Sequence, residues 1–289
     1  KIPYPKAPTL KCGRVLNPRT NLRSTTSTNR FRLMATNTKF QDFSFAGNKY
    51  AAFRPDYPPE LFELVLSRLE GKRDLAVDVG AGTGQASIPL CKYFKKVIGV
   101  EPSKGLFDVA AKAENLEFRE GTSDKLNFDD GSVDLVVAAQ AAHWFDMEKF
   151  YTECRRVLRQ KGLVAVWGYG TCTIDNNIAN EVLQNYYWQT LGGFWPKNRS
   201  HIDDHYIRIH PQPHQFETYD RINTSMSKSM PLPSFVGYLE TWSGRNEYMK
   251  ANPDKEDPLE PIKKQLHESY GDSEVNVSFP IFIVAAVKP

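Results

Sequence analysis

Short apolar segments alternate with amphipathic segments over the central part of the chain. Each apolar segment is long enough for one strand, and the segments between them place apolar residues at helical spacing. The predicted strands cover residues 74–79, 96–100, 116–119, 133–139 and 163–167. The predicted helices cover residues 59–70, 85–94, 103–113 and 147–159. Alternation of strands and helices with short loops is typical of a parallel sheet with helices on both faces.

This alternation stops after Gly170. A helical pattern follows over residues 178–191, and then a polar segment that is rich in aromatic residues and histidine. The last apolar pattern, residues 275–287, predicts a final antiparallel strand paired with one near 216–230. We therefore expect an α/β fold with a Rossmann-like, mostly parallel, seven-stranded sheet, an antiparallel last strand and a cap from the second half of the chain, at approximately 175–265.

The positive charge of the chain belongs to one end. The formal net charge is +3, but residues 1–33 hold eight bases and no acid, which leaves −5 for residues 34–289. Because this end also lacks apolar periodicity, we expect a disordered basic extension over 1–41 and one domain over 42–289. The extension has the composition of a mitochondrial transit peptide. The alternative is that residues 1–33 are additional upstream sequence, since Met34 begins a segment that is typical of a natural start.

Charge, apolar run lengths and cysteine usage constrain the partners and the compartment. A domain of charge −5 lacks the basic face that nucleic acid requires. No apolar run approaches the roughly 20 residues of a membrane span. The four cysteines form no CxxC pair, which favours a reduced compartment. We therefore expect a cytoplasmic protein, or a mitochondrial one if residues 1–33 are a transit peptide, that binds a small molecule as a monomer or weak homodimer.

A glycine-rich turn joins the first predicted strand to the next helix. Asp78 precedes Gly80, Gly82 and Gly84, and glycine lets a backbone turn tightly and a ligand approach closely. Glu101 ends the second predicted strand, where an acid can bind both ribose hydroxyls. A carboxylate at Asp78 would repel a pyrophosphate and attract an ammonium group. The ligand that fits both acids is a nucleoside with a cationic amino-acid tail, S-adenosylmethionine.

These motifs resemble those of the class I S-adenosylmethionine-dependent methyltransferases, type 11. The resemblance runs from about residue 45 to 167, and it assigns the three glycines to the first motif and Glu101 to the ribose. Residues 122–126 match a loop in which an acid, here Asp124, binds the adenine amino group. Gln140 follows the fourth strand, where the methionine end of the cofactor lies; the alternative is an ordinary polar loop residue.

A closer resemblance, to the trans-aconitate methyltransferase-like branch, rests on two short segments. Residues 50–58 read YAAFRPDYP, and residues 143–146 read HWFD. The resemblance implies that the first segment folds over the cofactor, which places Tyr50 at the cofactor and Tyr57 at the substrate. It also implies that small carboxylic acids are one class of methyl acceptor. The second half of the chain carries no motif that identifies the substrate.

Two residues of these segments are the candidates for chemistry. Arg54 could clamp a carboxylate bidentately, or it could pack on Tyr50 and Tyr57 as a structural cation–π pair. His143 could orient or deprotonate the acceptor, or it could line the pocket beside Trp144, a substrate-contacting or core residue. A carboxylate acceptor is already ionised and needs no base, whereas for a hydroxyl or an amine His143 is the best base candidate.

The histidine-rich part of the second half also allows a metal to be considered. His201 and His205 are one helical turn apart beside two aspartates, but Pro211 and Pro213 interrupt the segment. We therefore expect no metal site, and instead a cap over the substrate pocket. Its candidate apolar lining, which could equally be core, is Phe194, Trp195, Tyr206 and Trp242.

Three other functions remain as alternatives. The first is a non-catalytic subunit that binds S-adenosylmethionine, which a filled pocket in place of an open cleft would favour. The second is a methyltransferase for protein or nucleic acid, which a basic stripe beside the cleft would favour. The third is a dinucleotide oxidoreductase, which binding of a nicotinamide cofactor would establish.

Overall fold

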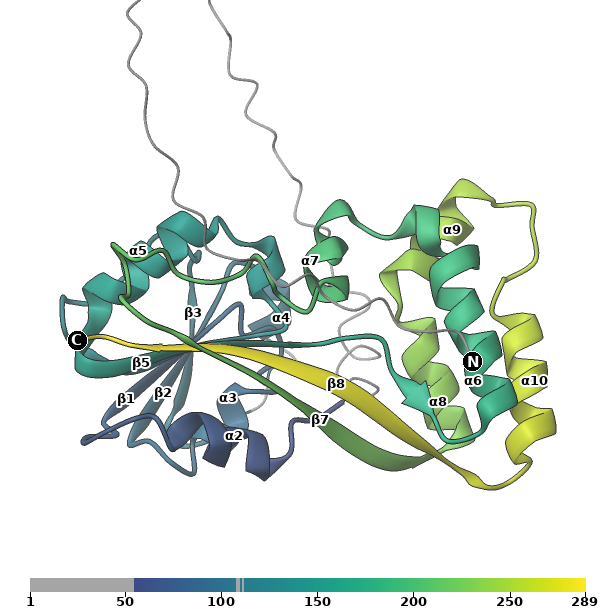
Figure 1. Ribbon diagram of the computed structural model, residues 1–289, viewed down its shortest axis with the longest axis horizontal. Helices are drawn as coiled ribbons and strands as arrows, with labels where there is room; N and C mark the ends of the chain where they lie inside the picture. The colour runs from purple at the N-terminus through teal and green to yellow at the C-terminus, as the bar shows by residue number, and fades with distance from the viewer. Residues whose placement is uncertain (1–54, 108–109, 111) are drawn as a thin grey trace, which may run out of the picture. The chain divides into compact units, whose positions relative to one another are not determined.

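The computed structural model describes residues 55–107, 110 and 112–289. The predicted extension over 1–41 and two predicted site residues, Tyr50 and Arg54, lie outside these residues. One sheet organises the described part of the chain (Figure 1). Its strands are β1 (Leu75–Val79), β2 (Lys96–Glu101), β3 (Leu116–Glu120), β4 (Val133–Ala139), β5 (Leu158–Tyr169), β6 (Thr173–Ile174), β7 (Asp220–Pro231) and β8 (Glu274–Val287).

The strand order is β3-β2-β1-β4-β5-β8-β6, with β7 on the opposite edge of β8 from β5 and β6. The pairs among β1 to β5 are all parallel, whereas β8 runs antiparallel to β5, β6 and β7. The predicted seven-stranded, mostly parallel sheet with an antiparallel last strand is thus confirmed. The two-residue β6 is an additional short strand beside the N-terminal half of β8.

Helices cover both faces of this sheet, and side-chain alternation along the strands shows how. Along β1, Ala76 packs into the apolar cluster that holds α2 (Pro59–Leu66), whereas Val77 and Val79 pack into the cluster that holds α5 (Met147–Val157). Successive strand residues point to opposite faces, so Asp78 shares the face of Ala76. The same face carries α3 (Ser87–Leu90), the helix that follows the glycine turn.

Some element boundaries differ from the predicted ones for local reasons. The helix predicted over 85–94 is regular only in α3: Pro89 has no amide hydrogen to donate to the carbonyl four residues before it, and tighter turns follow Leu90. The strand predicted over 163–167 begins already at Leu158, which pairs with Val133, so α5 ends at Val157 rather than at residue 159. Of the helix predicted over 103–113, the structure shows α4 (Lys104–Phe107), while residues 108, 109 and 111 are outside the described set.

The second half of the chain adds helices at the far end of the β7–β8 ribbon (Figure 1). Apart from Ile202, which packs into the cluster that contains α5, their apolar side chains continue the cluster that contains α2, so this helical part shares its core with the sheet. Residues 220–231, inside the predicted cap, belong to the sheet as β7. The regular helices are α6 (Asn177–Asn185), α7 (Ser200–Asp203), α8 (Leu232–Glu240), α9 (Ser243–Ala251) and α10 (Glu260–Tyr270). Short 3-10 or π turns cover Ala142–Trp144, Tyr186–Thr190, Gly192–Phe194 and Lys197–Arg199.

Candidate functional site

The glycine turn between β1 and α3 requires its glycines. Gly80, Gly82 and Gly84 have φ values of +71°, +56° and +93°, a region that residues with a Cβ rarely adopt. A Cβ on Gly80 would also lie 2.6 Å from the Cβ of Ala141, in the loop after β4. The Gly80 amide donates to the carbonyl of Val100 at 2.8 Å, which fixes the turn against the end of β2.

Asp78 is a buried carboxylate directly beneath this turn. Its Oδ2 accepts a hydrogen bond from the Ser87 hydroxyl at 2.6 Å, whereas its Oδ1 has no hydrogen-bond partner among the described residues. Burial raises the pKa of Asp78 to about 7, an effect that the bond from Ser87 opposes and the charge of Glu101 reinforces. A buried carboxylate with one oxygen unpaired favours a cationic or hydrogen-bond-donating ligand.

Glu101 brings a second carboxylate to the same turn from the end of β2. Its Oε2 accepts a hydrogen bond from the Gly82 amide at 3.0 Å, and its Oε1 accepts one from the Ser103 amide at 3.1 Å. Burial raises the pKa of Glu101, and these two amide bonds oppose that rise. Each carboxylate oxygen keeps a further lone pair with which it can accept a ligand hydroxyl.

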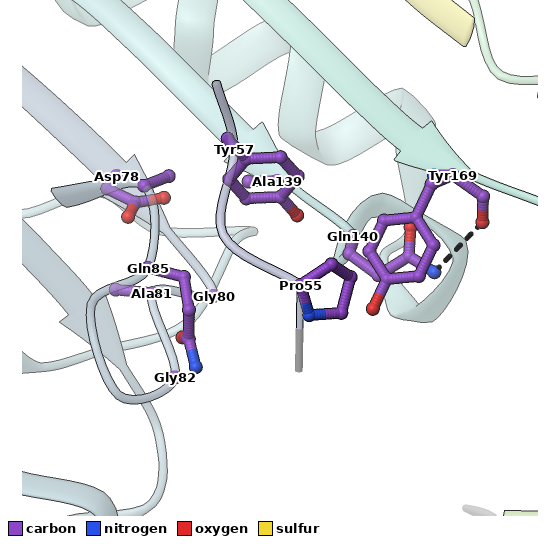
Figure 2. A pocket seen from close by; sticks show the side chains of 11 residues that line it. Pro55, Tyr57, Asp78, Gly80, Ala81, Gly82, Gln85, Ala139, Gln140 and Tyr169 are labelled. Atoms are coloured by element: carbon purple, nitrogen blue, oxygen red, sulfur yellow. Dashed lines mark hydrogen bonds between the residues drawn. The ribbon is translucent and has the colours of Figure 1, made fainter. Parts of the chain in front are cut away.

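A pocket lies between the glycine turn and a far wall formed by Pro55, Tyr57, Gln140 and Tyr169 (Figure 2). Gln140 has φ +54°, a rare backbone conformation for a residue with a side chain. Its side-chain amide is held by the Tyr169 backbone, accepting from the Tyr169 amide at 2.8 Å and donating to the Tyr169 carbonyl at 3.2 Å. The ends of β4 and β5 are thus locked together at the pocket.

The structure brings four of the eight predicted cofactor residues, and the predicted substrate residue Tyr57, to the lining of this pocket. The lining includes five predicted residues: Tyr57, Asp78, Gly80, Gly82 and Gln140. Gly84 lies in the same turn, and Glu101 is hydrogen bonded to it. Tyr169 and Gln85 also line the pocket and were missed from the sequence. Tyr169 could have been found from the fold, because it ends the strand next to β4, where the carboxyl ends of parallel strands meet.

Asp124 lies apart from the lining residues. It is exposed in the loop after β3, and its Oδ1 accepts a hydrogen bond from the Thr122 hydroxyl at 2.5 Å. That bond is the main cause of the lowered pKa of Asp124. The proposed adenine contact therefore rests on the resemblance of this loop and not on the described pocket.

His143 and Trp144 follow Gln140 in the 3-10 turn after β4, and neither of them lines the pocket. His143 Nδ1 lies 3.0 Å from the Tyr206 hydroxyl, and the His143 carbonyl accepts from Asn198 Nδ2 at 3.2 Å. Trp144 is 56 % exposed and its ring packs beside the His143 ring. The structure thus connects His143 to the segment that contains Asn198 and Tyr206, a connection that the sequence did not predict.

The predicted cap lining is largely cap interior. Trp195 and Trp242 pack with Tyr187 in an aromatic cluster, and Phe194 packs on Tyr248. None of these aromatic residues lines the described pocket. Within residues 55–289, where they are described, no group of three or more His, Cys, Asp or Glu side chains could hold a metal ion. No helix of that part is long and apolar enough to cross a membrane.

The site fits the ligand predicted from the sequence, a nucleoside with an ammonium-bearing tail. The unpaired Oδ1 of buried Asp78 can accept a hydrogen bond from an ammonium group. At Gly82 a Cβ would meet only one atom within 4 Å, at 4.0 Å, so the turn is open to close approach. The two carboxylates give the glycine turn a negative character, which suits a cation and opposes a pyrophosphate.

Known proteins are similar to this chain over most of its length. Residues 77–166 match the family model described as a methyltransferase domain. The chain is 42 % identical over 261 residues to a candidate methyltransferase of Dictyostelium discoideum, a match that covers 88 % of this chain and 97 % of that protein. It is 26 % identical over 275 residues to the candidate S-adenosylmethionine-dependent methyltransferase CRG1 of Saccharomyces cerevisiae, covering 84 % and 94 %.

A solved structure gives the same result. A candidate type II methyltransferase from Anaeromyxobacter dehalogenans matches with a TM-score of 0.72 and 30 % identity, covering 81 % of this chain and 98 % of that one. The fold, the glycine turn between β1 and α3 and these similarities agree. The chain belongs to the class I S-adenosylmethionine-dependent methyltransferases, and S-adenosylmethionine is its co-substrate.

Proposed function

We propose that this methyltransferase acts on a small molecule and that the methyl-accepting atom is an oxygen of an ionised carboxylate. The observation that carries the proposal is the placement of His143, three residues beyond Gln140 of the far wall, where an imidazole held by Tyr206 and Asn198 can donate a hydrogen bond to an anionic oxygen. Asp78 is the one acid among the described lining residues, and it lies at the glycine turn. No acid of the described lining lies opposite that turn to take a proton from an amine or an alcohol, whereas an ionised carboxylate needs no base. The resemblance of residues 50–58 and 143–146 to the trans-aconitate methyltransferase-like branch supports the same class.

In this proposal Asp78 holds the amino-acid tail of the cofactor and Glu101 holds its ribose. The Oδ1 of Asp78 accepts a hydrogen bond from the cofactor ammonium group, whose charge favours the ionised carboxylate. Glu101 accepts hydrogen bonds from the ribose hydroxyls while the amides of Gly82 and Ser103 keep it in place. Asp124 remains the candidate for the adenine amino group, on the strength of its loop alone.

The far wall is proposed to surround the reacting centre. S-adenosylmethionine supplies a sulfonium-bound methyl group. The Tyr57 and Tyr169 rings lie across the pocket from the glycine turn (Figure 2), so their π systems can stabilise a cation there. Both rings are buried against the core, which limits water at this end of the pocket. The chain then contributes alignment of two bound reactants and exclusion of water.

His143 is proposed to orient the acceptor carboxylate. It lies three residues beyond Gln140, and it is held by Asn198 at its carbonyl and by Tyr206 at its ring. An ionised carboxylate needs no base, so a hydrogen bond that places it is enough. Arg54, the second candidate for a carboxylate clamp, lies outside the described residues, and its role stays a prediction.

The segment that packs on His143 supports a small acceptor. Asn198 and Tyr206 both contact the turn after β4, so a segment from the second half of the chain lies against the turn that carries His143. The formal charge of −5 over residues 34–289 also disfavours a nucleic-acid substrate. Both observations favour a compact acid over a polymeric acceptor.

A panel of small acids, alcohols and amines with methyl-labelled S-adenosylmethionine tests the proposal. We expect label in one or more carboxylic acids, and we expect alkaline treatment to release it as methanol, since methyl esters hydrolyse and methyl ethers or N-methyl groups do not. The Asp78→Ala variant serves as the control without cofactor binding. Label that is transferred only to alcohols or amines, or that is stable to alkali, would contradict a carboxylate acceptor.

A further inference from the structure

We propose that Tyr206 is a positioning residue that fixes the tautomer of His143, so that His143 presents an N–H group at Nε2 and acts as a hydrogen-bond donor. The proposal rests on the proposed role of His143 in orienting the acceptor. It goes further by naming what sets that role: a cap residue 63 positions away in the sequence, joined to the imidazole at 3.0 Å.

The protonation state of Tyr206 is the first step. Its side chain is fully buried, and burial raises the pKa of Tyr206 well above its ordinary range, so the phenol keeps its proton. The buried hydroxyl therefore has a proton to donate, and the hydrogen-bond partner that the described residues offer it is Nδ1 of His143, at 3.0 Å.

The surroundings of the phenol leave Nδ1 of His143 as the acceptor. The Phe282 ring lies at 4.8 Å from the Tyr206 ring in an edge-on contact. A Cβ on Gly168 would lie 2.9 Å from Tyr206 Cζ and 3.1 Å from Gln140 Oε1, so that oxygen is also nearby, but among the described residues the Tyr206 hydroxyl is hydrogen bonded to His143 Nδ1 and not to Gln140. Donation from Tyr206 to Nδ1 satisfies the buried hydroxyl.

The consequence for His143 follows from imidazole chemistry. A neutral imidazole that accepts at Nδ1 carries its proton at Nε2. The opposite tautomer would leave the phenol O–H of Tyr206 buried without an acceptor, which is unfavourable. His143 is thereby a donor that suits an ionised acceptor oxygen, and it is not arranged as a general base.

The backbone around Tyr206 is built to hold this geometry. His205 and Tyr206 have φ values of +52° and +57°, and two successive non-glycine residues in this region are strained. Arg221 of β7 donates from Nη2 to the His205 carbonyl at 2.9 Å and from Nη1 to the Tyr206 carbonyl at 3.0 Å. The His205 ring also stacks on Phe282. One guanidinium thus ties the strained turn to the sheet.

Nitrogen NMR of ¹⁵N-histidine-labelled protein tests the tautomer without any substrate. His143→Asn identifies the His143 resonances by their disappearance. We expect the wild type to show a protonated Nε2 and an unprotonated Nδ1, and Tyr206→Phe to show both tautomers. Tyr186→Phe is the matched control, because Tyr186 is a buried cap phenol whose hydroxyl has no partner among the described residues. A wild type protonated at Nδ1, or no change in Tyr206→Phe, would overturn the proposal.

Kinetics provide the second readout, on any acceptor that the enzyme is found to methylate. Loss of one hydrogen bond predicts that Tyr206→Phe lowers kcat about 3- to 10-fold with the KM for S-adenosylmethionine unchanged. Arg221→Gln should lower kcat in the same direction, and Tyr186→Phe should not. An unchanged kcat in Tyr206→Phe would overturn the positioning role. If no acid is methylated but the tautomer is as stated, the acceptor assignment fails and the Tyr206–His143 relationship stands.

Discussion

The Asp78 carboxylate and the Ser87 hydroxyl form a 2.6 Å hydrogen bond that uses only one oxygen of the acid, Oδ2. The other oxygen, Oδ1, is buried without a hydrogen-bond partner in the part of the chain that the structure describes. A carboxylate in this situation is costly to ionise and gains strongly from a nearby cation. The same acid therefore weakens the ligand-free fold at neutral pH and favours a cationic cofactor.

This relationship predicts a pH-dependent gain in stability for Asp78→Asn. The pKa of Asp78 is raised from 3.8 to about 7, so the native state binds this proton more tightly than the unfolded state. The resulting destabilisation is absent below the unfolded value and develops as the pH rises towards 7. Without cofactor, the free energy of unfolding of Asp78→Asn should be about 1–3 kcal/mol higher than that of wild type at pH 8, with a smaller difference at pH 5.

Urea unfolding of the ligand-free protein at the two pH values measures this difference. Ser87→Ala removes the 2.6 Å hydrogen bond from the hydroxyl, which favours the ionised form, so it should destabilise the protein more at pH 8 than at pH 5. A stability difference between Asp78→Asn and wild type that is equal at both pH values would show that Asp78 does not titrate in this range.

The close approach of the glycine turn to the loop after β4 predicts a large effect for Gly80→Ala. The new Cβ would lie 2.6 Å from the Cβ of Ala141, and the backbone would keep a φ of +71°. Strain and overlap together should lower the free energy of unfolding by about 2–4 kcal/mol. Gly271→Ala is the matched control, with φ +54° but no atom within 4 Å of its Cβ. Equal losses in the two variants would show that φ, and not Ala141, demands glycine at position 80.

Asp134 is predicted to be a structural acid that joins β1 to β4. Its Oδ2 accepts from the backbone amides of Asp74 and Leu75, both at 2.8 Å, and its Oδ1 pairs with Arg159. Asp134→Ala would leave the two amides without these partners and remove the charge paired with Arg159, which would keep its bonds to the Glu70, Lys72 and Gln160 carbonyls, so the loss should be about 3–5 kcal/mol. Urea unfolding measures this loss. Glu70→Ala, which removes an exposed ion pair with Lys161, is the control, and its free energy of unfolding should stay close to that of wild type. A small loss for Asp134→Ala would contradict the structural role.

The fold could be predicted from the sequence because its signals are local. Buried parallel strands appear as continuous apolar runs, and helices appear as apolar stripes between them, so the sheet and its covering layers were found. The exceptions depend on contacts that spacing does not reveal. Leu158 joins β5 only because it pairs with Val133, and the two-residue β6 exists only beside β8.

The candidate site divides in the same way. Asp78, the glycines and Glu101 lie within two successive βα units, so their meeting could be predicted from topology. Tyr169 reaches the pocket only because β5 lies next to β4, and Tyr206 reaches His143 across 63 residues that include the π turn and α7. Tyr206 was predicted only as a possible cap-lining residue. Its strained turn, held by Arg221, has no sequence signal.

Calorimetric binding of S-adenosylmethionine and of adenosine, which lacks the amino-acid tail, tests the central assignment most directly. The charged contacts predict that Asp78→Asn loses about 10- to 100-fold in affinity for S-adenosylmethionine and little for adenosine, whereas Glu101→Gln weakens both. Glu120→Gln is the control, since Glu120 ends β3 beside Glu101 but is exposed. If Asp78→Asn and Glu101→Gln both bind S-adenosylmethionine with wild-type affinity, the two carboxylates do not hold the cofactor and the account is contradicted.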